Sequence, residues 1–121
     1  MARPILSEEH IDPAIREVVD QRYRETVDEV RRTVETTPVV VVGMKHNPHV
    51  RRARKALEAA GVAHTYLEYG SYTGEWRRRS AIKMWSGWHT FPHVFVKGVL
   101  IGGANETVKL LADGELQRRL A

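Results

Sequence analysis

The stretch that decides the fold reads Pro38-Val39-Val40-Val41-Val42-Gly43-Met44-Lys45-His46-Asn47-Pro48. An unbroken run of β-branched residues is typical of a strand that is buried on both faces, as in the middle of an α/β sheet. After a short loop, Asn47 suits the N-cap of a helix and Pro48 suits its first position. We therefore expect a central strand that leads through this loop into a helix.

Downstream of Pro48, apolar residues recur at helical spacing as far as Gly61, which predicts a helix that stops at this glycine. The strand–helix–strand unit that follows should be right-handed with parallel strands. This order predicts a four-stranded mixed sheet with helices on both faces, the thioredoxin-fold arrangement, in a domain of residues 38–121. The other predicted elements are a strand at 63–69, a helix at 75–85, a hairpin of strands at 93–97 and 99–101 around Gly98, and helices at 105–112, capped by Asn105, and 115–120.

Residues 1–37 are predicted to form an additional N-terminal helical extension. Asp12-Pro13 has the pattern of a helix start, and Thr36-Thr37-Pro38 has that of a helix end. The apolar residues between them form one stripe, and a break near Tyr23 is compatible with their spacing. We expect this helix to pack on the domain, or to pair with a second copy or another protein. The stripe consists of Ile15, Val18, Val19, Tyr23, Val27, Val30 and Val34.

The composition excludes several classes of protein. The 121 residues include no cysteine. This excludes disulfides, thiolate metal sites, cysteine-ligated iron–sulfur clusters and a cysteine nucleophile. The chain has no run of about 18 apolar residues that could form a transmembrane helix, so we expect no membrane partner. Its first ten residues lack the apolar run of a signal peptide, so we expect a cytoplasmic location.

Charge is distributed unevenly along the chain. Residues 1–37 carry six basic and nine acidic side chains, a net charge of −3, whereas residues 38–121 carry thirteen basic and six acidic, a net charge of +7. Two interpretations remain open: ordinary solvated faces, or an acidic helix that docks on a basic anion-binding surface. The arginines clustered within residues 51–55 and 77–79 indicate charged outer helix faces. We expect no nucleic-acid partner, because no stacking-aromatic motif accompanies them.

The second half of the chain carries a more specific pattern. It reads Trp85-Ser86-Gly87-Trp88-His89-Thr90-Phe91-Pro92-His93-Val94-Phe95-Val96-Lys97-Gly98, then Ile101-Gly102-Gly103-Ala104-Asn105. This pattern closely resembles that of monothiol glutaredoxins, and residues 39–57 match the first strand and active-site helix of that family. The resemblance covers residues 38–121 and implies a glutaredoxin fold.

This sequence departs from the family pattern at the positions where the family carries its reactive groups. The family's Cys-Pro-Tyr-Cys motif falls on Asn47-Pro48-His49-Val50, and the Cys-Asp of its Gly-Gly-Cys-Asp turn falls on Ala104-Asn105. The spacer that monothiol members carry before the motif is missing. Thiol–disulfide exchange needs a thiolate at the helix N-terminus, which Asn47 cannot supply. We therefore expect no oxidoreductase activity and no 2Fe–2S cluster bound through this chain.

The resemblance also implies a groove for glutathione. Pro92 would be the family's cis-proline, and Asn105 lacks the charge to pair with an ammonium group. Two interpretations remain open: a groove that still binds glutathione or another small anion, and a relic pocket without a ligand. The positions that correspond to the family's glutathione-binding residues are Lys45, Arg79, Phe91, Gly103, Ala104 and Asn105.

Histidines suggest an alternative function. His46 and His49 flank Asn47, and His89 and His93 flank Pro92, so four imidazoles would converge if the two loops lie side by side. Imidazole is a good ligand for zinc, copper or nickel. Their spacing matches no standard metal motif, so exposed or hydrogen-bonded histidines are the other interpretation. An enzyme with non-thiol chemistry ranks last, because the sequence offers no paired carboxylates or Ser-His-Asp arrangement there.

Overall fold

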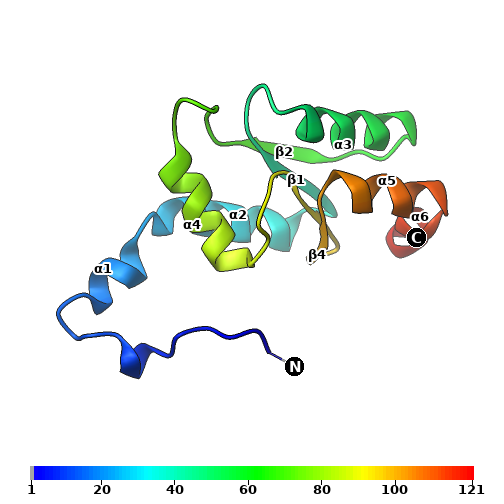
Figure 1. Ribbon diagram of the computed structural model, residues 1–121. Coiled ribbons are helices and arrows are strands. Elements are labelled where there is room, and N and C mark those ends of the chain that lie inside the picture. Colours follow the sequence, from blue (N-terminus) through cyan, green and yellow to red (C-terminus); the bar gives the residue numbers. More distant parts are fainter. Residues whose placement is uncertain (1) are drawn as a thin grey trace.

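The computed structural model describes residues 2–121 and contains a four-stranded sheet with helices on both faces (Figure 1). The element order agrees with the prediction for a thioredoxin-like domain. The elements are the short 3-10 helix Glu8–His10, α1 (Arg16–Gln21), α2 (Arg24–Thr36), β1 (Val39–Gly43), α3 (Pro48–Ala59), β2 (Thr65–Glu68), α4 (Trp76–Ser86), β3 (His93–Val96), β4 (Val99–Gly102), α5 (Ala104–Ala112) and α6 (Glu115–Leu120).

Strand β1 lies inside the sheet, whose order is β2-β1-β3-β4. It pairs in parallel with β2 and antiparallel with β3, and β3 pairs antiparallel with β4. All five residues of β1 are buried. The β-branched run therefore forms the central strand that the sequence predicts, and the sheet is mixed.

The valines of β1 divide between two hydrophobic clusters, because successive side chains of a strand point to opposite faces. Val40 and Val42 pack in one cluster with residues of α2 and α4, while Val39 and Val41 pack in the other with residues of α3, α5 and α6. The largest fully buried side chains that these helices contribute are Leu57, Ile82 and Leu116. One apolar strand thus joins both layers of helices.

The predicted N-terminal helix is divided in two. Tyr23 adopts a left-handed backbone conformation with φ 49° between α1 and α2, which confirms a break at this residue. The predicted start at Asp12 is wrong, because α1 begins at Arg16. Asp12 still accepts a hydrogen bond from the Ala14 backbone N–H at 2.8 Å, but it closes a turn that precedes the helix.

The break separates a buried half of the apolar stripe from an exposed half. Three valines of α2, the last of them Val34, belong to the core. In contrast, Val18 of α1 is 64% exposed and Val19 is 47% exposed. A cavity of about 400 Å³ lies between α1, α2 and α4, and Val19 and Met84 are among its lining residues. Pairing of α1 with a second copy or another protein, like the domain boundary at residue 37, stays a prediction.

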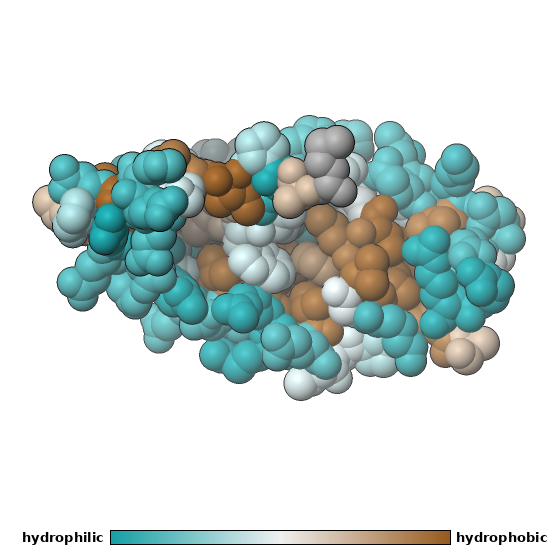
Figure 2. Space-filling view, turned by 90° about the horizontal axis from the view of Figure 1, so that it is seen from below, coloured by the Kyte–Doolittle hydropathy of each residue, from teal (hydrophilic) through white to brown (hydrophobic). Residues whose placement is uncertain are grey.

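One face of the molecule is seen from below in Figure 2, where hydrophobic surface lies near the centre and hydrophilic residues cover both ends. Within residues 2–121, no helix combines the length and apolar character needed to cross a lipid bilayer.

Candidate functional site

The first turn of α3 forms one wall of the site, and Asn47 fixes it. The Asn47 Oδ1 atom accepts hydrogen bonds from the backbone N–H groups of His49 at 2.9 Å and Val50 at 3.1 Å. Pro48 occupies the first turn, where its missing N–H costs no hydrogen bond. The predicted N-cap is therefore confirmed. The side chain at the position of the family's reactive cysteine is engaged in holding the helix end.

Replacing Asn47 with alanine should lower the free energy of unfolding by about 1 kcal/mol, because two N–H groups of the first turn lose their acceptor. Denaturant unfolding followed by circular dichroism measures this change. Asn47→Asp is the matched control, since its carboxylate can accept the same two hydrogen bonds. Equal losses in both variants would contradict the capping role.

A groove of about 290 Å³ opens between the start of α3, residues 88–91 and the start of α5. The Phe91–Pro92 peptide bond beside it is cis, as the resemblance implies. The groove therefore lies where the former active-site helix meets the cis-proline loop. Its lining residues are His49, Arg52, Trp88, His89, Thr90, Phe91, Gly103, Ala104, Asn105 and Glu106.

The α5 end of the groove is held by side-chain hydrogen bonds. Arg52 Nη2 donates to Asn105 Oδ1, which joins α3 to α5. The Gly103 N–H donates to Glu106 Oε1 at 2.8 Å, and the Thr107 hydroxyl donates to the Gly103 carbonyl at 2.8 Å. The predicted cap of this helix is wrong: Gly103 takes the N-cap position and Asn105 lies inside α5. Asn105 therefore faces Arg52 and does not close the helix end.

Neither of the two predicted glutathione-binding cations lines the groove. Arg79 is buried, and its Nη1 atom donates to the carbonyls of Tyr69 at 2.8 Å and Gly74 at 2.6 Å. Lys45 is exposed beyond the end of β1, where its backbone N–H donates to the Gly70 carbonyl. The other predicted positions are better placed: Phe91, Gly103, Ala104 and Asn105 all line the groove, and Pro92 follows Phe91 directly.

Sequence reasoning missed the cation that does line the groove. Arg52 lies three residues after His49, and residues three apart share a helix face, so helical spacing alone could have placed both at the groove. Trp88, Thr90 and Glu106 also line it without having been predicted as ligand-binding residues. The Trp88 indole N–H is buried without a hydrogen-bond partner within the described chain, and it lies close to Gly103.

The four histidines proposed as metal ligands do not converge. In the part of the chain that the structure describes, no group of three or more His, Asp or Glu side chains is arranged to hold a metal ion. The reason lies in β3, where His93 is fully buried and stacks on Phe91 at 4.5 Å between ring centroids. Its Nδ1 atom lies 3.2 Å from the Ser86 hydroxyl. His49 and His89 line the groove, but His46 does not.

Burial determines the protonation of His93. Desolvation of the imidazolium, reinforced by the positive charge of Lys83, lowers the pKa of His93 to about 4. The Nε2 atom has no hydrogen-bond partner among residues 2–121. His93 is therefore a neutral core residue at neutral pH rather than a ligand exposed to solvent.

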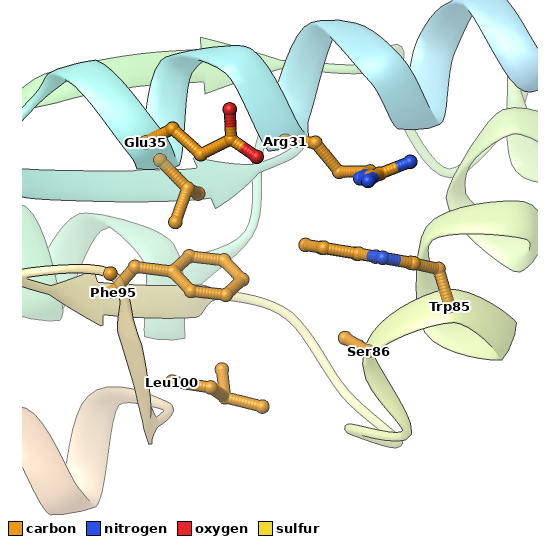
Figure 3. Close-up of a pocket in the computed structure, with 8 residues that line it drawn as sticks. Arg31, Glu35, Trp85, Ser86, Phe95 and Leu100 are labelled. Carbon is orange, nitrogen blue, oxygen red and sulfur yellow. The ribbon is translucent and has the colours of Figure 1, made fainter.

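A further cavity, of about 360 Å³, lies between α2, α4 and the β3–β4 hairpin (Figure 3). The rings of Trp85 and Phe95 form its walls with their centroids 5.9 Å apart, while Arg31 and Glu35 lie above them on α2. None of the predicted binding residues lines this cavity, so it forms a separate amphipathic surface.

Comparison with known proteins identifies the family. The glutaredoxin family model matches residues 48–101. A glutaredoxin-like protein of Dictyostelium discoideum is 45% identical over 98 residues, which cover 81% of this chain and 80% of that protein. The chain belongs to the glutaredoxin family. Glutaredoxin-C6 of Oryza sativa subsp. japonica is 33% identical over 86 residues, covering 71% of this chain and 77% of the relative.

Solved structures of glutaredoxins confirm the fold. The buckwheat glutaredoxin–glutathione complex matches with a TM-score of 0.73 at 23% identity, over 84% of this chain and 92% of that chain. Oxidized glutaredoxin 2 from Chlamydomonas reinhardtii matches with a TM-score of 0.70 at 23% identity, over 81% of this chain and 92% of that chain. This glutaredoxin-family chain thus combines the thioredoxin-like fold with a sequence that contains no cysteine.

Proposed function

We propose that this glutaredoxin-family chain is a non-catalytic binding protein whose groove takes glutathione or a similar small anionic peptide. One observation carries the proposal: an open groove lies beside the cis-proline, although Asn47, the N-cap of α3, stands where the family has its nucleophile.

The chemistry at Asn47 supports binding without catalysis. Disulfide exchange proceeds by attack of a thiolate on a sulfur atom, and a carboxamide has neither the acidity nor the nucleophilicity for this step. The Asn47 oxygen is further occupied by two backbone N–H groups. With no cysteine elsewhere in the chain, no second thiol can replace it. For the same reason the chain supplies no thiolate ligand to a 2Fe–2S cluster.

The walls of the groove suit a peptide with carboxylates. Arg52 provides a guanidinium, which forms strong charge-assisted hydrogen bonds to carboxylates. Gly103 and Ala104 bring small residues to the α5 wall, so that a ligand backbone can approach closely. The related buckwheat glutaredoxin forms a complex with glutathione, a peptide whose size and two carboxylates match these features.

Titration calorimetry with reduced glutathione tests the proposal. We expect saturable binding by the wild-type chain. Thr90→Trp should abolish this binding, because Thr90 is an exposed lining residue and an indole there would fill the groove. Thr73→Trp is the matched control, since Thr73 is exposed in the loop before α4 and does not line the groove. Absence of heat with the wild type would overturn glutathione as the ligand, and equal binding by the Thr90 variant would overturn the groove as its site.

A further inference from the structure

The groove carries its cation at the α5 end. Of its ten lining residues, Arg52 is the one that is positively charged at every accessible pH, and Glu106 is the acidic one. Helices α3 and α5 pack side by side (Figure 1). The hydrogen bond from Arg52 Nη2 to Asn105 Oδ1 spans them. The guanidinium is therefore anchored at this end instead of ranging freely over the surface.

This anchoring changes what Asn105 can recognise. A carboxamide accepts hydrogen bonds only through its oxygen, and that oxygen already receives the N–H of Arg52. An ammonium group placed here would have to share this uncharged oxygen, through its second lone pair, with a guanidinium whose positive charge repels it. A carboxylate would find the remaining donors of the guanidinium, which carries five N–H groups in all.

Glu106 offsets this preference only in part. Its Oε1 atom accepts the Gly103 N–H at 2.8 Å, so one of the two carboxylate oxygens is engaged at the N-cap of α5. It also lies in the first turn of α5, where the partial positive charge of the helix N-terminus compensates a carboxylate. Arg52, in contrast, is exposed to solvent and to any ligand that enters the groove.

We propose that Arg52 makes the groove select anionic ligands that carry a carboxylate but no ammonium group at the Asn105 end. This inference rests on the proposed binding function and specifies its ligand class. The ligands would be N-acylated peptides or small dicarboxylates, rather than peptides that carry an ammonium group beside the carboxylate. Arg52 acts as the specificity-determining residue, both through attraction of the carboxylate and through repulsion of the ammonium.

Paired titrations with two ligands test the selection. The first ligand is glutathione, and the second is glutaryl-cysteinyl-glycine, which differs from glutathione only by lacking the ammonium group. We expect the deaminated ligand to bind about tenfold more tightly to the wild-type chain at low ionic strength, and the ratio to shrink in high salt because the charges are screened.

Two matched variants locate the effect. Arg52→Gln removes the charge and should bring the affinity ratio of the two ligands close to one. Arg51→Gln removes the same charge from the neighbouring exposed position, which does not line the groove, and should leave the ratio unchanged. Because the readout is a ratio measured on each folded variant, a general change in stability does not imitate it.

The possible outcomes distinguish a failure of the selection by Arg52 from a failure of the binding function. Saturable binding with glutathione equal to or tighter than its deaminated analogue would overturn the role of Arg52 while leaving the binding function intact. An equal change of the ratio in both arginine variants would also overturn it. If neither ligand binds the wild-type chain, the binding function itself fails, and the selection by Arg52 fails with it.

Discussion

Replacing Arg79 with alanine should lower the free energy of unfolding by about 3 kcal/mol, the range for removing a buried charged donor from acceptors that stay buried. The guanidinium holds the carbonyls of Tyr69 and Gly74, at the two ends of the loop that precedes α4. Without it, both carbonyls lose their charge-assisted hydrogen bond. Denaturant unfolding monitored by fluorescence of the three tryptophans measures the loss.

Two further variants define the cause of that loss. Arg79→Met keeps most of the buried alkyl volume and removes only the donors, so it should retain most of the destabilisation. Arg78→Ala is the control, at the exposed neighbouring position. The ion pair of Arg78 with Glu75, at 3.2 Å, should contribute no more than about 0.5 kcal/mol to the free energy of unfolding. Groove ligands should bind folded Arg79→Met with unchanged affinity. Lost binding at unchanged stability would instead support the ligand-binding role that the family resemblance implies for Arg79.

Acidification should destabilise the protein through His93. Its pKa is about 4 in the folded chain, compared with about 6.5 for a histidine in the unfolded chain, so the unfolded state binds the proton more readily. The stabilising contribution is therefore complete above about pH 6.5 and is lost as the pH falls toward 4. A depression of this size corresponds to about 3 kcal/mol at the low end of that range.

The measurement compares unfolding free energies of the wild type and His93→Gln from pH 7.5 to pH 4. The difference between the two profiles isolates His93 from the carboxylates that titrate at the lower end. His10→Gln, at an exposed histidine of the N-terminal segment, should follow the wild-type profile. Parallel profiles for the wild type and His93→Gln would refute the assignment of His93 as a buried neutral base.

Features encoded by neighbouring residues could be predicted from the sequence. The valine run of β1 and the Asn47–Pro48 start of α3 depend on side-chain shape and local hydrogen bonding, and both occur as expected. The start of α1 depends on more distant packing. Asp12 has the chemistry of a cap, but the residues after it have no core to cover, and the helix begins only at Arg16.

The candidate site was predictable only in part for a similar reason. The backbone positions near Pro92 and Gly103 follow from the fold and line the groove as the family resemblance implies. The fold does not determine which basic side chains line the groove. Arg77, Arg78 and Arg79 are adjacent and chemically identical, and only tertiary packing determines that Arg79 alone is buried. To predict that Arg52 lines the groove, one needs both the helix geometry of α3 and the position of α5.

Gly43 shows how a residue outside the groove controls its width. A Cβ atom at this end of β1 would lie 2.7 Å and 2.8 Å from the two methyl carbons of Val50. A side chain here would force Val50, in the first turn of α3, to move, and Asn47 caps that same turn. Because Gly43 has no Cβ atom, the first turn of α3 can lie close to the end of β1. A redesign of the groove should therefore keep Gly43, together with the hydrogen bonds that Asn47 and Glu106 make at the starts of α3 and α5.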